Sequence, residues 1–187
     1  MRISFDLSDA DLKHFRGVMR DVRARCKKMN EEEIVEAAKQ LLEDIESTSA
    51  PDFVTERVSR LHELIEMLED EDWALGGKDR ERVVNGLAYF AEPEDMIHDK
   101  VPVLGYLDDA IMIELVVIEL QHEIDAYDDF IAFRQTREER FGREEDPKIR
   151  EEWVVSRRKA LHQRMRRRRS RRRSKRGSSG RGPTALF

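Results

Sequence analysis

Residues 108–120 read Asp-Asp-Ala-Ile-Met-Ile-Glu-Leu-Val-Val-Ile-Glu-Leu, and they determine how the chain can fold. After the two aspartates almost every side chain is apolar, and only Glu114 and Glu119 interrupt the run. A helix that is apolar nearly all round lies in the centre of a bundle unless it can span a bilayer, which takes about 18 uncharged residues. The run therefore predicts a buried central helix that begins near Asp108 and continues to about Arg137.

The segment that leads into this helix, residues 90–109, contains two prolines, a glycine and several aspartates. Proline ends helices, and glycine and aspartate are frequent in turns, so the chain is expected to reverse direction here. Asp108 or Asp109 would then accept hydrogen bonds from the free amides at the start of the central helix.

The fixed positions of this segment resemble the YkvA-like domain of unknown function, the DUF1232 family, over roughly residues 80–125. The family combines a Pro-x-Asp-x-Ile-Pro-Asp turn, a Pro-x-x-Gly step and an Asp-Asp pair that enters an aliphatic helix. The matching residues are Pro93, Asp95, Ile97, Asp99, Pro102, Gly105, Asp108 and Asp109, whereas His98 stands where the family usually has proline. The resemblance implies a helical-hairpin module from a family widespread in bacteria, and it implies no catalytic activity.

Further helices are predicted on both sides of this hairpin, because apolar residues recur at helical spacing and few β-branched runs occur. Ser8 and Asp11 have the spacing of a capping box at the start of the first. A later helix is expected to end near Asp72, before a break at Gly76-Gly77, and the last helix is expected to begin at Asp146-Pro147. We expect an all-α bundle of about six helices with a buried helical hairpin and a basic C-terminal extension. Its expected parts are N-terminal amphipathic helices (1–50), the helical core (51–140), a charged helix with an Arg-rich extension (141–176) and a disordered tail (177–187).

Charge is divided very unevenly along the 187 residues, although the formal net charge is only -5. Of the 35 basic residues 14 lie between Arg157 and Phe187, and all 40 acidic residues precede them. Residues 1–156 therefore carry a formal charge of -19 and the rest carry +14. Such a division suggests a tail that binds polyanions on an acidic carrier.

The same composition argues against several classes of protein. Cys26 is the single cysteine, so no disulfide can form within the chain, and a reducing compartment is expected. The N-terminal residues lack the apolar core of a signal peptide, and no segment is apolar enough to span a membrane. We therefore expect a cytoplasmic protein without a membrane span.

The basic tail gives the strongest indication of function. Between Arg164 and Arg176 only three residues are not basic. Arginine forks bind phosphate oxygens in pairs and each contact releases a counterion, so nucleic acid is the expected partner, RNA rather than DNA. The tail could instead meet the acidic part of the same chain, a protein partner or anionic lipid. The predicted nucleic-acid-binding residues are Arg164, Arg166, Arg167, Arg168, Arg169, Arg171, Arg172, Arg173, Lys175 and Arg176.

Chemistry at a metal centre has weaker support. Carboxylates suit hard cations, and Glu119 and His122 have the Glu-x-x-His spacing of di-iron bundles, but no second copy of that motif occurs. Capping and turn roles explain the aspartates more simply. Cys26 lies on an apolar helix face and is expected to be an inert buried thiol. The metal candidates are Asp95, Asp99, Asp108, Asp109, Glu119 and His122, and no catalytic residue or cofactor is predicted.

Together these observations predict a non-enzymatic adaptor that binds nucleic acid, RNA or the ribosome, through its Arg-rich tail. Two other functions remain open at this point. One is a protein interaction or scaffold module, in which the acidic body binds a protein partner, and the other is a metal-dependent enzyme.

Overall fold

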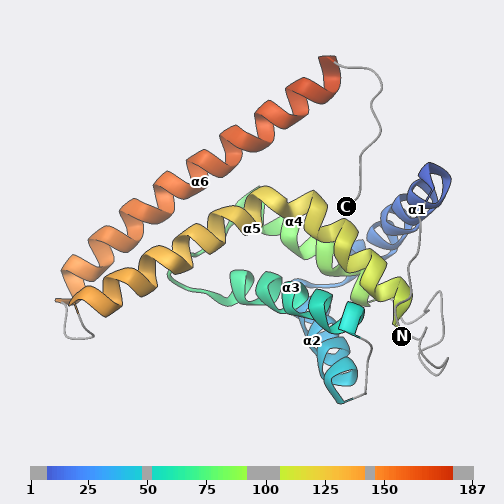
Figure 1. The fold of residues 1–187 in the computed structure, drawn as a ribbon, viewed down its shortest axis with the longest axis horizontal. Coiled ribbons are helices and arrows are strands. Elements are labelled where there is room, and N and C mark those ends of the chain that lie inside the picture. Colours follow the sequence, from blue (N-terminus) through green and yellow to red (C-terminus); the bar gives the residue numbers. More distant parts are fainter. Residues whose placement is uncertain (1–7, 48–51, 92–105, 142–145, 179–187) are drawn as a thin grey trace. The chain divides into compact units, whose positions relative to one another are not determined.

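A computed structural model describes residues 8–47, 52–91, 106–141 and 146–178, and in these residues all regular structure is helical (Figure 1). The predicted all-α class is therefore confirmed. Two 3₁₀ turns, η1 (Cys26–Lys28) and η2 (Ala88–Ala91), continue the first and the fourth helix. The six α-helices are α1 (Asp9–Arg25), α2 (Glu31–Ser47), α3 (Asp52–Glu69), α4 (Gly77–Leu87), α5 (Leu107–Phe141) and α6 (Pro147–Ser178).

Side-chain caps start the first two helices as the sequence indicates. Ser8 and Asp11 form the predicted capping box, in which the Ser8 amide donates to the Asp11 carboxylate over 2.9 Å. The hydrogen bonds from Ser8 hold the pKa of Asp11 below its ordinary value. Asn30 and Glu33 make the same reciprocal pair before α2, at 2.9 and 2.8 Å. These caps satisfy amides that have no partner within the helix.

Three helix boundaries differ from the predicted ones. α3 ends at Glu69, before the expected end near Asp72, and α5 continues to Phe141 instead of stopping near Arg137. α4 begins at Gly77, whose φ of +57° lies in the left-handed region that glycine tolerates. Gly76 and Gly77 thus lie between α3 and α4, and Gly77 is also the first residue of α4. Apolar spacing alone does not indicate this second role.

The chain forms two compact units. Unit 1 comprises Met1–Asp70 and Leu75–Leu120, and unit 2 comprises Glu71–Ala74 and Gln121–Phe187. The boundary between the two units falls within α5, after Leu120. The sequence instead predicted boundaries after residues 50, 140 and 176.

Unit 1 is built around the apolar first part of α5, as the sequence predicts. Met112, Ile113 and Val116 have no exposed surface. The two interrupting glutamates meet arginines at the edge of the core, since Glu114 pairs with Arg57 over 3.4 Å and Glu119 with Arg23 over 3.0 Å. The run is therefore a buried central helix with its charges matched at the surface.

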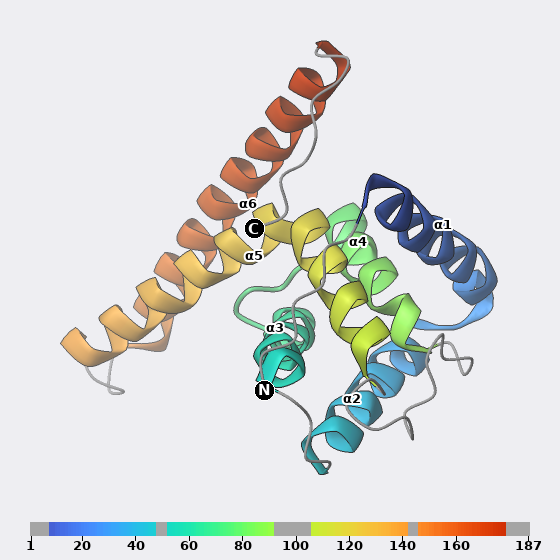
Figure 2. The same cartoon turned by 45° about the vertical axis from the view of Figure 1, so that its right-hand side comes forward.

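α4 packs closely against α5 in this unit, and Figures 1 and 2 both show the two helices side by side. A Cβ atom placed on Gly86 would lie 3.0 Å from side-chain carbons of both Val116 and Leu120. The absence of a side chain at Gly86 thus sets the approach of the two helices. Among the described helices, none combines the length and the apolar character that a bilayer crossing requires.

Candidate nucleic-acid interface

The predicted interface lies on α6, which begins at the Asp146-Pro147 pair that the sequence indicates. The Asp146 carboxylate accepts a hydrogen bond of 2.8 Å from the amide of Lys148. Proline suits the first helical position because the amide it lacks would have no partner there. From this start α6 runs without a break to Ser178, so the Arg-rich residues are part of a regular helix.

Within unit 2, α6 lies antiparallel to the second part of α5, as both cartoons show. Near the connection between them, the rings of Phe133 and Trp153 meet edge to face with centroids 5.6 Å apart, and the Arg157 guanidinium lies 4.6 Å from the Phe133 centroid. Further along α6, Leu161 and Met165 are buried. One face of α6 thus packs in the core of the unit.

Trp73 fills the centre of unit 2, although it comes from the turn that follows α3. Its ring is completely buried. The ring centroid lies 5.7 Å from that of Tyr127, 5.2 Å from that of Phe130 and 4.3 Å from that of His162. Asp72 and Trp73 belong to unit 2, where Trp73 packs in the core, and this explains why α3 ends before them.

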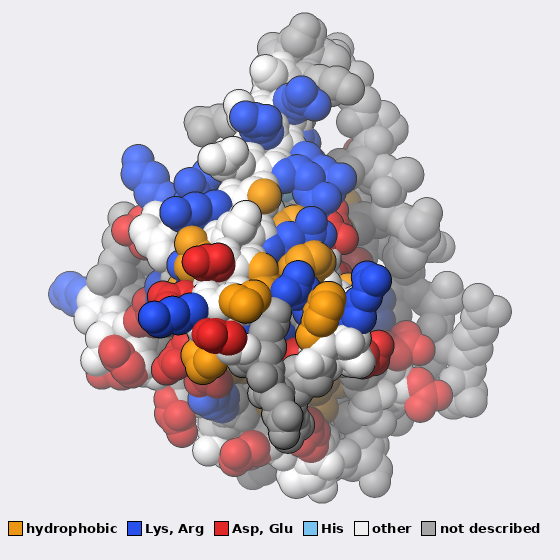
Figure 3. Space-filling view, turned by 90° about the vertical axis from the view of Figure 1, so that its left-hand side faces the viewer, with side chains coloured by type: hydrophobic (Ala, Val, Ile, Leu, Met, Phe, Trp, Pro, Cys, Tyr) orange, Lys and Arg blue, Asp and Glu red, His pale blue; other side chains and the backbone are white. Residues whose placement is uncertain are grey.

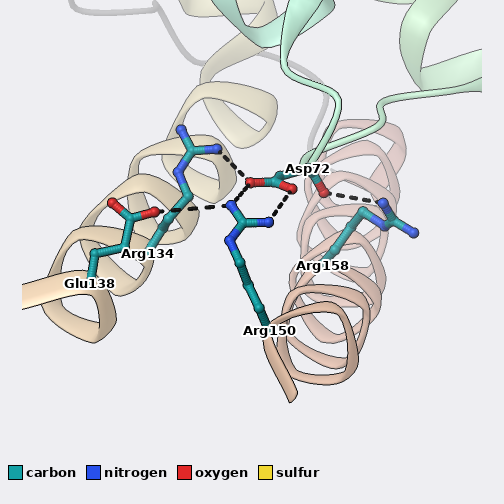
Figure 4. A network of polar contacts seen from close by, with 5 residues as sticks. All are labelled: Asp72, Arg134, Glu138, Arg150 and Arg158. Carbon is teal, nitrogen blue, oxygen red and sulfur yellow. Dashed lines mark hydrogen bonds and ion pairs between the residues drawn. The ribbon is translucent and has the colours of Figure 1, made fainter. Parts of the chain in front are cut away.

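Asp72 joins the two helices of unit 2 by a network of ion pairs (Figure 4). Arg150 donates to both carboxylate oxygens, over 3.0 and 2.5 Å, and Arg134 donates to one over 3.2 Å. Arg158 donates to the backbone carbonyl of Asp72 over 3.1 Å, and Glu138 lies 4.0 Å from Arg150. Hydrogen bonds from Arg150, and then from Arg134, hold the pKa of Asp72 below its ordinary value although burial opposes this shift.

The Arg-rich end of α6 pairs in part with carboxylates of α5. Arg164 forms an ion pair with Asp129, and Arg168 pairs with Asp125 over 3.5 Å. Arg169 donates to Glu123 over 2.6 Å, and this glutamate has no exposed surface. At least these three of the ten predicted nucleic-acid-binding residues are therefore engaged within the chain itself. The structure thus realises, for these three, the alternative in which the tail meets the acidic part of the chain.

Other arginines at the same end of α6 are exposed. Arg166, Arg167 and Arg171 are exposed there, and no Asp or Glu follows Glu152 in the chain. In the described part of the chain, neither Arg167 nor Arg171 takes part in an ion pair. Arg172 is half-buried, and the side chains of Arg173, Lys175 and Arg176 lie outside the described residues. The exposed positive face is therefore narrower than the sequence alone suggests.

The family-motif residues are only partly described. Asp108 and Asp109 stand in the first turn of α5 and are buried, with 2% and 5% of their surface exposed. Carboxylates in the first turn lie at the positive end of the helix dipole, and the capping hydrogen bonds stay a prediction. The other motif residues lie outside the described residues, and they are Pro93, Asp95, Ile97, Asp99, Pro102 and Gly105.

The metal candidates that the structure describes do not come together in a metal site. Among the described residues, no group of three or more His, Cys, Asp or Glu side chains could hold a metal ion. Glu119 pairs with Arg23, and both ring nitrogens of His122 are buried without a hydrogen-bond partner in the described chain. Asp95 and Asp99 fall outside that chain. Cys26 is buried as predicted, and its thiol lies 3.5 Å from the carbonyl oxygen of Ala88.

A second exposed surface, missed from the sequence, lies where α5 ends and α6 begins. Phe141 and Ile149 are each 52% exposed. The Arg137 guanidinium lies 4.6 Å from the Phe141 centroid and 5.1 Å from that of Trp153. Figure 3 looks at this face and shows hydrophobic side chains among Lys and Arg. The four-residue spacing of Arg137 and Phe141 on one helix was the signal that could have revealed it.

Comparison with known proteins gives one result. Residues 83–115 match the model of the family described as "Protein of unknown function (DUF1232)", which confirms the resemblance inferred from the motif. The matched residues include the last part of α4, η2 and the first part of α5, and they stop before unit 2. No curated protein and no solved structure matches the chain.

Proposed function

We propose that the protein binds nucleic acid, RNA in particular, through the exposed face of the Arg-rich end of α6. The observation that supports this proposal is the exposure of Arg166, Arg167 and Arg171 on a helix that has no carboxylate after Glu152. Because the buried face of α6 is fixed by Leu161 and Met165, these guanidinium groups are presented on an ordered scaffold.

Phosphate is the ligand that this surface suits best. A guanidinium group offers paired donors to phosphate oxygens, and each neutralised phosphate releases a condensed counterion. Aromatic side chains for base stacking are absent from this end of α6, so recognition rests on phosphate and shape and not on base identity. The expected binding is micromolar, indifferent to sequence and strongly dependent on salt.

The acidic remainder of the chain restricts how the polymer can lie. Residues 1–156 carry a formal charge of -19 and repel the same phosphates that residues 157–187 attract. Nucleic acid is therefore confined to the Arg-rich end, and the protein does not coat the polymer with its whole surface. In this way the acidic part could carry another component to RNA, as an adaptor does.

A pair of exposed arginines tests the proposal. In the double variant Arg167→Gln, Arg171→Gln, affinity for a fluorescein-labelled oligouridylate longer than the Arg-rich end should fall by on the order of tenfold near 0.1 M salt, because two phosphate contacts are lost. The slope of log affinity against log salt should flatten by about 1.4. Fluorescence anisotropy measures both quantities, and a DNA oligomer of equal length tests the preference for RNA.

The matched control is Lys13→Gln, Arg16→Gln, which removes the same charge from exposed positions on α1. An equal loss of affinity in the control would show that net charge and not the face of α6 matters, and would refute the proposal. These substitutions are cleaner than deletion of residues 164–187, because the deletion also removes Met165, which is buried, and the Arg169 partner of Glu123.

A protein-binding role is the second candidate function, and the exposed Phe141 and Ile149 favour it. Large exposed apolar side chains are frequent in protein interfaces. If the protein associates with itself through them, the double variant Phe141→Ser, Ile149→Ser should remain monomeric at concentrations where the wild type forms oligomers. Sedimentation velocity in the absence of nucleic acid decides this, and a monomeric wild type would argue against self-association.

A further inference from the structure

The carboxylates of α5 that face the Arg-rich end are spaced to match it. Asp125 and Asp129 are four residues apart on α5, and their partners Arg168 and Arg164 are four residues apart on α6. Residues four apart lie on one face of a helix, so antiparallel helices bring two successive pairs into register. Asp125 and Asp129 thus form ion pairs with two of the ten residues predicted to bind phosphate.

These two pairs lie at the surface. The side chains of Arg164 and Asp129 are 41% and 45% exposed, and those of Arg168 and Asp125 are 48% and 37% exposed. Water and salt screen such pairs, and their net contribution to stability is small. Opening them therefore costs little.

The neighbouring pair of Arg169 and Glu123 is of another kind. Glu123 has no exposed surface, and Arg169 is 28% exposed. Removal of Arg169 from this carboxylate would take an ion pair from a buried charge, which is unfavourable. The arginines thus fall into three classes. Arg169 holds a buried carboxylate, Arg164 and Arg168 form surface ion pairs that a ligand can replace, and Arg167 and Arg171 form no ion pair within the described residues.

We propose that Asp125 and Asp129 compete with nucleic-acid phosphate for Arg168 and Arg164, and that they set the charge density a polyanion needs in order to bind. This inference rests on the proposed function of α6. A carboxylate and a phosphate diester carry the same single charge, so an isolated anion gains little by displacing an aspartate. A nucleic acid supplies many phosphates on one chain and releases its condensed counterions, so it can displace both.

Two adjacent aspartates provide the test. Asp129 pairs with Arg164, whereas Asp128 is exposed and takes part in no ion pair within the described residues. Asp129→Asn and Asp128→Asn change the net charge equally and at neighbouring positions, but only the first frees an arginine. Far-ultraviolet circular dichroism checks that both variants keep their helices.

Affinity for the labelled oligouridylate is measured by anisotropy from about 50 to 200 mM KCl. Asp129→Asn should bind several times more tightly than Asp128→Asn, because Asp128→Asn still has a carboxylate that the polymer must displace from Arg164. The salt slopes of the two variants should be similar, because the polymer contacts the same arginines in both complexes. The double variant Asp125→Asn, Asp129→Asn should add a second increment of similar size. Free inorganic phosphate at the same ionic strength should leave these differences unchanged.

The outcomes separate this inference from the proposed function. If the wild type binds through Arg167 and Arg171 but Asp129→Asn and Asp128→Asn are equal, competition is refuted and the binding proposal stands. If only the variants that lack Asp125 and Asp129 bind, the aspartates block the site in the wild type and the inference is supported. If no variant binds, both proposals fail.

Discussion

The two units of this chain obtain their stability from different side chains. In unit 1 the largest fully buried residues are aliphatic, among them Leu61, Leu64, Met112 and Ile113. In unit 2 the centre is Trp73 with its aromatic neighbours, and arginines reach the surrounding carboxylates and rings. The difference shows that arginines can hold the helices of a small unit together as well as bind a ligand. How many arginines remain for nucleic acid depends on this division of roles.

The largest effect is expected when the aromatic centre of unit 2 is removed. Trp73→Ala should destabilise this unit by about 3 to 5 kcal/mol, because a completely buried ring leaves a cavity among Tyr127, Phe130 and His162. Hydrogen exchange measured by mass spectrometry should show lost protection in residues 121–141 and 150–172. Amides of α2 and α3 in unit 1 should keep their protection.

A matched control is Trp153→Ala, since Trp153 is half-buried and in contact with Arg137 over 5.1 Å. Its cost should be about 1 to 2 kcal/mol. Equal loss of protection in both units after Trp73→Ala would mean that they unfold as one body, and the contrast between them would then carry no energetic meaning.

A smaller effect is expected at the ion-pair network of unit 2. Asp72→Asn should lower the free energy of unfolding by about 2 kcal/mol at pH 7, because Arg150 and Arg134 lose a charged acceptor. The folded pKa of Asp72 lies below its ordinary value of 3.8, so the carboxylate stabilises the fold above that value. As the pH falls through the ordinary value toward the folded one, this contribution is lost.

Urea unfolding at a series of pH values measures the difference between wild type and Asp72→Asn. The difference should be constant near neutral pH and should shrink below about pH 4. Asp128→Asn, at an exposed position, serves as the control for loss of one charge. A difference that persists unchanged at pH 3 would assign the effect of Asp72 to packing and not to its charge.

The helices and the core of unit 1 could be predicted because their signals are local. Ile34, Ala38 and Leu42 recur at helical spacing and are all buried, and the Ser8 cap is formed as expected. Hydrophobic burial imposes this period on any amphipathic helix, so a single sequence displays it.

The core of unit 2 could not be predicted in this way, because its partners are far apart in the chain. Asp72 meets Arg134, Arg150 and Arg158 across 62, 78 and 86 residues. Local spacing assigned Asp72 to the end of a helix, and nothing in that pattern selects these arginines among many. Only the short connection between α5 and α6 indicates an antiparallel pair.

The candidate interface shows the same limit in another form. Arginine density predicts where the positive charge lies, and α6 does carry it. Density cannot show which side of the helix faces α5, so it gave Arg164 and Arg169 the same role as Arg167. The four-residue spacing of Asp125 and Asp129 is visible in the sequence, but it acquires meaning only once α5 and α6 are known to be antiparallel.

The smallest effect concerns two glycines of unit 1 and tests whether its aliphatic core is as tightly packed as the contrast requires. At Gly17, within α1, an added Cβ meets no atom within 4 Å, so Gly17→Ala should stabilise the protein by up to about 1 kcal/mol through helix propensity. At Gly86 the same methyl group lies 3.0 Å from carbons of Val116 and Leu120. The cost of overpacking, about 1 to 3 kcal/mol, should exceed the gain in propensity, so Gly86→Ala should be destabilising by about 1 kcal/mol. Thermal unfolding of the two variants compares their signs directly. If Gly86→Ala stabilises as much as Gly17→Ala, α4 and α5 can separate without cost, and the packing of unit 1 is as adaptable as the arginine contacts of unit 2.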